Sequence, residues 1–188
     1  MIVKEYKKSL PKLKSECHNL SRMNIFDFLS QHQIEFERFD HPPVFTYEQA
    51  KQLLANKLLP IMPGVETKNL FLRNRKGERH FLVSVPAPKM VDLKALAKVL
   101  ESDRLSMASP ERLMQHLGVE PGSVTLLGLI NDKAQAVKVL LDTAIWEAEA
   151  VQCHPLVNSA TLIIKQPDLR RFLAFTGHTA KVMAVPSL

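Results

Sequence analysis

The sequence predicts an α/β fold, in which a mixed β-sheet is surrounded by helices in a single domain. Three observations predict it. Segments with the apolar alternation of strands are interleaved with segments that carry helix caps. Two of the strands are joined by a tight turn, as in an antiparallel hairpin. No internal repeat, low-complexity tract or linker interrupts the chain after residue 23. Alternating strands and helices favour a layered α/β domain, and the hairpin makes its sheet mixed.

The predicted hairpin begins at residue 70. Residues 70–73 alternate like a half-buried strand, residues 74–77 read Asn-Arg-Lys-Gly and form a turn, and residues 80–85 form a second apolar run. Lys68 and Asn69 stand at the mouth of this hairpin, although both are weak strand formers. They are therefore expected either to form a solvated edge or to face something that needs a cation and an amide.

Helices are predicted from their capping residues. Asn24, Thr46, Asp92 and Ser109 each precede an apolar-periodic segment and can accept a hydrogen bond from its first turn. Glycines at 118 and 177 favour the left-handed conformation that ends a helix. The expected helices cover residues 25–33, 47–54, 93–100, 110–117 and 167–175. The remaining expected strands cover residues 136–141, 160–165 and 181–185, and residues 36–45 are expected to be extended.

Composition predicts a cytoplasmic protein. Of the 188 residues, 46% are apolar, which suffices for a core. No apolar run approaches the roughly 20 residues that a membrane helix needs, and the N-terminus has no apolar signal core. Cys17 and Cys153 are too few for a disulfide framework, which favours a reducing compartment.

The charge is concentrated at the N-terminus. Six lysine and arginine residues against two acidic residues give the first 22 residues +4 of the chain's net charge of +6. We therefore expect a basic extension over residues 1–22, followed by a domain over residues 23–188. Such an extension can strengthen nucleic-acid binding through phosphate contacts. It can equally be a solvated tail without a role.

Several common catalytic and metal motifs are absent from the sequence. It contains no phosphate loop, dinucleotide fingerprint, HExxH, paired CxxC or GxSxG motif. The two Cys-His dipeptides, at residues 17–18 and 153–154, lack the spacing of a zinc site. Cys153 is expected to be a buried, small apolar side chain. No metal and no cofactor is expected.

Two polar stretches can form a site. Residues 117–132 contain Gly122 and Gly128, and such a loop can present backbone N–H groups to an oxyanion. An ordinary turn before a buried strand is the alternative. His154 stands before a proline, where a turn residue is a sufficient explanation. His178 lies just beyond the last helix, where a cation near the negative end of the helix dipole is sufficient.

Taken in order, five stretches resemble one family. They are DHPPVFTYEQA, PGVETKNLFLRN, VDLKALAKVL, RLSMASPERLMQHLGVEPGSVTLLGLIND and HPLVNSATLII. Their succession resembles the YbaK/ProX family of aminoacyl-tRNA editing proteins. The ProX branch, free-standing relatives of the prolyl-tRNA synthetase editing domain, is the most similar. The resemblance covers about residues 24–185.

The resemblance implies a mixed-sheet α/β fold whose cleft accepts the aminoacylated 3′ end of a tRNA. It implies proofreading by hydrolysis of a mischarged ester, with alanyl-tRNA for proline as the typical ProX substrate. Cysteinyl-tRNA for proline, or another small aminoacyl ester, is the alternative. The implied partner is tRNA, with prolyl-tRNA synthetase as a further candidate. A rival from another class is a non-catalytic tRNA-binding or regulatory module.

The resemblance also implies roles for individual residues. The family's key lysine, glycine loop and pocket histidine match the catalytic candidates Lys68, Gly122 and His154. The substrate-binding candidates are Asn69, Arg73, Arg104, Ser123 and Asn158.

One position departs from the family pattern. The family loop reads Gly-x-x-x-Pro, whereas here Leu126 stands at the proline position. Proline would fix φ and stiffen the loop, whereas leucine leaves it freer and bulkier. Loop preorganisation, and with it substrate choice or rate, is therefore expected to depend on Leu126.

Overall fold

The computed structural model describes residues 24–44, 46–57 and 59–188. The expected basic extension, including Cys17, lies outside the described residues. Eight described strands form one sheet in the order β1-β7-β6-β2-β3-β5-β8, with β4 beside β2. Antiparallel pairs such as β2–β3 and parallel pairs such as β3–β5 occur together, so the mixed sheet is confirmed.

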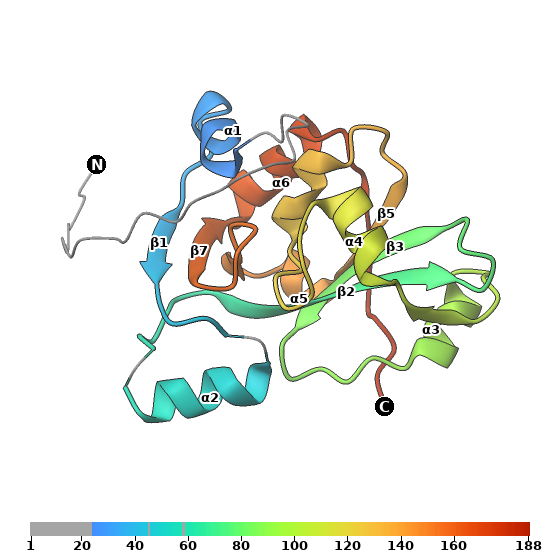
Figure 1. The fold of residues 1–188 in the computed structure, drawn as a ribbon, viewed down its shortest axis with the longest axis horizontal. Helices are drawn as coiled ribbons and strands as arrows, with labels where there is room; N and C mark the ends of the chain where they lie inside the picture. Colours follow the sequence, from blue (N-terminus) through green and yellow to red (C-terminus); the bar gives the residue numbers. More distant parts are fainter. Residues whose placement is uncertain (1–23, 45, 58) are drawn as a thin grey trace.

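The strands and helices alternate along the chain. The strands are β1 (Glu37–Asp40), β2 (Val65–Asn74), β3 (His80–Pro86), β4 (Leu105–Met107), β5 (Val137–Asp142), β6 (Ala150–Cys153), β7 (Ala160–Lys165) and β8 (Ala180–Met183). The helices are α1 (Ile25–Gln31), α2 (Tyr47–Ala55), α3 (Leu93–Val99), α4 (Pro110–Leu117), the 3₁₀ helix η1 (Leu126–Asn131), α5 (Thr143–Trp146) and α6 (Gln166–Phe175). Figure 1 shows α1, α4 and α6 above the sheet and α2 and α3 below it.

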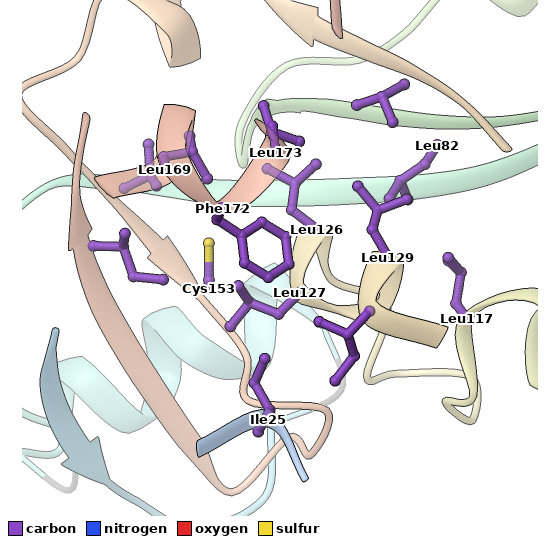
Figure 2. Packing of buried hydrophobic residues seen from close by; sticks show 14 of the residues in the cluster. Ile25, Leu82, Leu117, Leu126, Leu127, Leu129, Cys153, Leu169, Phe172 and Leu173 are labelled. Carbon is purple, nitrogen blue, oxygen red and sulfur yellow. The ribbon is translucent and has the colours of Figure 1, made fainter. Parts of the chain in front are cut away.

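The larger core lies between the sheet and the helices of the upper layer. Figure 2 shows the ring of Phe172 from α6 with Leu126, Leu127 and the sulfur of Cys153 around it. All four side chains are almost completely buried. A smaller core on the other face of the sheet packs α3 against β2, β3 and β5. Both faces of the central strands are therefore covered, as the sequence predicted.

The helix caps follow the sequence. Asn24, Thr46, Asp92 and Ser109 each accept a hydrogen bond from a backbone N–H two or three residues further on. Gly118 ends α4 with φ of 67°. These local interactions satisfy N–H groups that a helix leaves unpaired at its start. Within the described chain, no helix combines the length and apolarity needed to cross a membrane.

The predicted start of the hairpin was wrong. Its first strand, β2, begins at Val65, five residues earlier, so Lys68 and Asn69 lie inside the strand and not at its mouth. They are paired with Val85 and Ser84 of β3. Pairing with a strand that is buried on both faces outweighs the weak strand propensity of the two residues.

Short elements were missed. β4 and β6 have three and four residues, too few for a periodic pattern. The stretch 117–132 was expected to be a loop, but its second half is η1, and Gly128 lies within that helix. A Cβ atom at Gly128 would come within 3.0 Å of the Leu117 Cβ, so this glycine permits close packing of η1 against α4.

Candidate active site

The main cleft lies beside the middle of β2. β3 occupies one edge of this strand along residues 67–73. On the other edge, β6 pairs only with Val65 and Glu66, and β4 pairs only from Leu72 onward. A cleft of about 600 Å³ lies along the stretch between them. Because it lies at a gap in the sheet, side chains from both faces of β2 line it.

The structure brings half of the expected site residues together at this cleft. The residues that line it are Lys68, Asn69, Gly122 and His154. They come from β2, from the loop between α4 and η1, and from the end of β6. Folding therefore joins three segments that are more than 30 residues apart in the sequence.

Lys68 is a cation without a partner among the described residues. Its side chain is half-buried and makes no hydrogen bond or ion pair with a described residue. A buried ammonium without a counter-charge is costly, and a half-buried one keeps part of its hydration. Lys68 is therefore available to an anionic ligand such as a phosphate.

Asn69 belongs to a chain of polar side chains along the cleft floor. The Ser84 hydroxyl donates to Asn69 Oδ1, and Asn69 Nδ2 donates to Thr67 Oγ1 at 3.3 Å. Thr67 Oγ1 in turn donates to the backbone oxygen of Gln152 in β6, at 2.7 Å. These bonds fix the amide orientation of Asn69 and leave one of its two amide hydrogens for a ligand.

The loop at Gly122 presents backbone donors. Gly122 has φ of 88°, a conformation that favours glycine, and the Ser123 N–H donates to the Glu120 oxygen at 3.0 Å, which closes the turn. The N–H groups of Gly122 and Val124 donate to no described residue, and both residues line the cleft. Two backbone donors are therefore available at the cleft, which is the chemistry that an oxyanion-binding loop requires.

Leu126 does not enter the cleft. It is the first residue of η1, after the N-cap Thr125, and its side chain is completely buried in the larger core. Proline is favoured at the first position of a helix because its fixed φ suits it. The backbone here is therefore held by the helix and its cap, with the leucine side chain anchored in the core.

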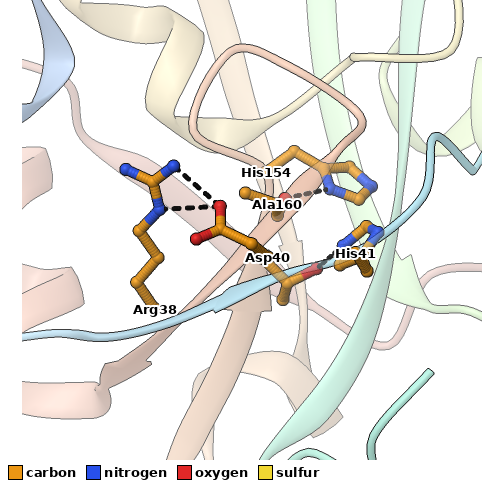
Figure 3. A network of polar contacts seen from close by, with 6 residues as sticks. Arg38, Asp40, His41, His154 and Ala160 are labelled. Atoms are coloured by element: carbon orange, nitrogen blue, oxygen red, sulfur yellow. Dashed lines mark hydrogen bonds and ion pairs between the residues drawn. The ribbon is translucent and has the colours of Figure 1, made fainter. Parts of the chain in front are cut away.

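His154 presents an acceptor nitrogen. Its Nδ1 lies 3.1 Å from the Ala160 carbonyl oxygen, which can only accept, so Nδ1 carries the proton. Its Nε2 makes no hydrogen bond with a described residue. Figure 3 shows this contact and the neighbouring His41, whose ring centroid is 6.5 Å from that of His154. Burial, and then the nearby His41, lower the pKa of His154, while the Ala160 contact opposes them. The imidazole is therefore neutral at neutral pH.

The other four candidates lie away from the cleft. Arg73 donates to the backbone oxygens of Asn74 and Arg75 at the hairpin turn. Arg104 is exposed just before β4, at the same corner of the molecule. Ser123, the neighbour of Gly122 in the loop, is buried and does not line the cleft. The Asn158 backbone oxygen accepts from Val44, a residue that lines the cleft.

Sequence reasoning missed His41 and Glu66, which also line the cleft. His41 Nδ1 donates to the Pro42 oxygen at 2.8 Å, so its Nε2 accepts from the Thr161 hydroxyl at 2.9 Å. Burial raises the pKa of Glu66. The sequence His-Pro-Pro could have indicated His41, since the two prolines restrict the backbone and thereby fix the direction of the preceding side chain. No sequence signal indicated Glu66, because Glu66 lines the cleft only where the pairing of β2 with β6 ends.

The described residues contain no group of three or more His, Cys, Asp or Glu side chains that could hold a metal ion. Burial raises the pKa of the Cys153 thiol to about 12, so the thiolate form is suppressed. The expectation of a buried, small apolar side chain at Cys153 is confirmed.

Solved structures share this fold. One, described as a candidate trans-editing enzyme for prolyl tRNA synthetase, matches with a TM-score of 0.63 and 19% sequence identity. The match covers 92% of this chain and all of the other. Another, described as hypothetical protein APE2540, matches with a TM-score of 0.64 and 16% identity over 87% of this chain and 99% of the other. The chain therefore shares the fold of these two proteins.

Sequence comparisons identify the family. The family model for the aminoacyl-tRNA editing domain matches residues 41–172. Prolyl-tRNA editing protein ProX of Acetoanaerobium sticklandii is 33% identical over 155 residues, which are 82% of this chain and 92% of that protein. Prolyl-tRNA synthetase associated domain-containing protein 1 of Danio rerio is 35% identical over 87% of this chain and 86% of its own. The chain belongs to the aminoacyl-tRNA editing domain family and is an aminoacyl-tRNA deacylase.

Proposed function

We propose that this deacylase hydrolyses mischarged tRNA for proline in trans, with alanyl-tRNA as its main substrate. The observation that carries the proposal is the convergence of Lys68, Asn69, Gly122 and His154 on one cleft. The names of the relatives, a prolyl-tRNA editing protein and a domain associated with prolyl-tRNA synthetase, support the choice of tRNA and make that synthetase a candidate partner. The volume of about 600 Å³ suits a terminal aminoacyl-adenosine.

In this proposal Lys68 and Asn69 hold the terminal adenosine and its phosphate. Lys68 suits a phosphate because it has no partner among the residues that the structure describes, and Asn69 retains one amide hydrogen for a ligand. Arg73 and Arg104 would contact the acceptor end outside the cleft. Ser123 would support the glycine loop through its backbone bond to Glu120, and Asn158 would support the wall through its backbone bond to Val44.

Hydrolysis needs no strong nucleophile, because the ester is already activated. A water molecule, assisted by the neighbouring ribose hydroxyl, attacks the carbonyl carbon. The N–H groups at Gly122 and Val124 would stabilise the oxyanion, and each such donor can contribute about 100- to 1000-fold in rate. The ester bond then breaks, and the ribose oxygen leaves with a proton. His154, neutral and with a free Nε2, would place the water or shape the amino-acid pocket.

Selectivity would be steric. Leu113, Phe71 and Val124 form an apolar wall of the cleft, and the first two are almost completely buried and cannot yield easily. An extra methylene alone changes pocket binding by only about 1–3 kcal/mol, but a rigid wall can exclude the larger proline ring. Cysteine, whose unbranched side chain has one heavy atom more than that of alanine and no ring, remains the alternative substrate.

A pair of lysine variants tests the assignment of the cleft. Lys68→Ala should reduce the deacylation rate by about 100-fold through loss of orientation. Its melting temperature should stay within about one degree of the wild type, since Lys68 contacts no partner in the described part of the chain that the variant would lose. Lys138→Ala, at an exposed lysine of β5 away from the cleft, is the matched control and should retain wild-type turnover. Full turnover by Lys68→Ala would remove the cleft from the mechanism.

A further inference from the structure

The gap in the sheet exposes unpaired backbone groups of β2. Successive strand residues direct their N–H and C=O groups to opposite edges. The Ala87 N–H donates to the Glu66 oxygen on the β3 side, whereas the Ala108 N–H donates to the Phe71 oxygen on the β4 side, each at 2.9 Å. Odd-numbered residues of β2 therefore face the gap. Among these, Asn69 lies midway between β6 and β4.

Four of these backbone groups have no partner among the residues that the structure describes. They are the C=O of Thr67, the N–H and the C=O of Asn69 and the N–H of Phe71. Asn69 and Phe71 both line the cleft. An unpaired strand edge is a ready template for another extended group, and here the cleft admits only a short one.

An aminoacyl ester carries the complementary groups. Its α-ammonium is a donor and its carbonyl oxygen an acceptor, on either side of one α-carbon, as in a single strand residue. We propose that β2 binds the aminoacyl group as one added β-residue, an inference that rests on the proposed function. The α-ammonium donates to the Asn69 oxygen, and the ester carbonyl accepts from the Asn69 N–H. Strand addition is a common way of binding peptides, reduced here to one residue.

The direction of this added residue is antiparallel to β2. In that direction the adenosine, which follows the carbonyl, extends toward Lys68 and Thr67, where the strand is half-buried and borders the cleft. The reverse direction would drive the adenosine toward Phe71, which is 2% exposed, and toward the start of the pairing with β4. Antiparallel pairing also lets one residue, Asn69, serve both groups of the ligand.

This direction places the amino-acid side chain. Residues directly opposite each other in an antiparallel pair have their side chains on the same face. The face of Asn69 is that of Phe71, which packs in the larger core, and Leu113 and Val124 line the cleft on that side. An L-amino acid would thus point its side chain at the apolar wall, where only a small one fits.

The same contact assists the reaction. As water adds to the carbonyl carbon, negative charge develops on the oxygen that accepts from the Asn69 N–H. This N–H therefore acts with the Gly122 loop as a second donor to the oxyanion. The backbone of Asn69 would contribute to the rate separately from its side-chain amide, which is held by Ser84 and Thr67.

Replacing one backbone amide by an ester tests this inference. The Asn69→Ala variant removes the side chain and keeps the backbone N–H. Lactic acid, the hydroxy-acid analogue of alanine, can be incorporated at the same position by nonsense suppression. The two forms then differ only in that the backbone N–H is replaced by oxygen. The ester form should cleave alanyl-tRNA about 100-fold more slowly than Asn69→Ala. Its melting temperature should fall less than that of an ester at Leu70, because the Asn69 N–H has no partner among the described residues and only the Lys68 carbonyl, which faces β3, becomes a weaker acceptor. The hydroxy-acid analogue of leucine at Leu70 is the control: that N–H faces β3, so stability should fall and the rate should not.

A second substrate separates this inference from the proposed function. Propionyl-tRNA for proline lacks only the α-ammonium, and its enzymatic rate relative to its spontaneous rate should be at least about tenfold below that of alanyl-tRNA. Equal relative rates, or equal rates for the alanine and lactic acid forms at position 69, would overturn strand addition while leaving the deacylase proposal intact. Failure to cleave alanyl-tRNA at all would instead overturn the proposed substrate.

Discussion

His80 should make the fold sensitive to acid. This first residue of β3 is 5% exposed, and its Nε2 lies 3.0 Å from Arg112 Nη1. Arginine can only donate, so Nε2 accepts and the ring is neutral. Its centroid lies 4.2 Å from that of His116. Burial, and then the charges of His116, Arg112 and Arg73, lower the pKa of His80 to about 4, against an opposing effect of Asp132.

The size of the effect follows from the two pKa values. The unfolded chain takes up a proton at His80 below its ordinary value of 6.5, whereas the folded protein does so only near 4. Stability contributed by neutral His80 is therefore complete above pH 6.5 and is lost as the pH falls toward 4. At about 1.4 kcal/mol per pKa unit, the loss between pH 7 and pH 4.5 is about 2.5 kcal/mol.

Urea denaturation at pH 7 and pH 4.5 measures this loss. His80→Gln keeps an acceptor for Arg112 but cannot titrate, so its loss of stability between the two pH values should be smaller by about 2.5 kcal/mol. His116→Gln should also reduce this loss of stability, because the pKa of His116 is lowered too. The reduction should be smaller than for His80→Gln, because the pKa of His80 is the more strongly lowered. An equal loss in wild type and His80→Gln would refute this role of His80. Because Phe71 stacks on His80 and lines the cleft, deacylation should weaken in the same pH range.

Three further predictions concern the cleft and the periphery. His154→Ala should fold and should change the ratio of alanyl to cysteinyl ester cleavage more than it changes tRNA affinity; an unchanged ratio would contradict a pocket role. His178→Ala should lower the unfolding free energy, measured in urea, by roughly 2–4 kcal/mol, because the ring is buried and its Nε2 contacts Asp132 at 3.1 Å. The deacylation rate of the folded variant should equal that of the wild type. Deleting residues 1–22 should weaken tRNA binding and flatten its salt dependence at a constant saturated rate; an identical salt slope would make the extension a mere tail.

The sequence anticipated elements whose signals are local. The capped helices at Asn24, Thr46, Asp92 and Ser109 form where expected because side chain and backbone within one turn determine each cap. The burial of Cys153 was expected because a free cysteine ordinarily behaves as a small apolar side chain. The position of Lys68 was predicted wrongly because the length of β2 depends on its pairing with β3. In this pairing Lys68 lies opposite Val85, 17 residues further along the chain, and no local sequence pattern indicates such a contact.

The local sequence patterns indicated only part of the candidate site. The chemistry of Lys68, Gly122 and His154 was visible in single motifs, but each motif also had an ordinary structural explanation. Their convergence depends on where β6 and β4 leave β2 unpaired, which is a property of the sheet. His178 was expected to be a cation near the end of the last helix. In the structure its ring is buried and hydrogen-bonded to Asp132, 46 positions earlier in the sequence, a contact that no local pattern could indicate.

The most direct test of the central claim is a deacylation panel with purified wild-type protein. EDTA-treated protein would be incubated with alanyl-, cysteinyl- and prolyl-tRNA for proline, and the remaining ester would be measured against time. We expect hydrolysis of the alanyl ester well above its spontaneous rate, slower cleavage of the cysteinyl ester, and no cleavage of the cognate prolyl ester. If all small aminoacyl esters stay intact, the cleft is not a deacylase site; if the prolyl ester is cleaved as fast as the alanyl ester, selection by size is wrong.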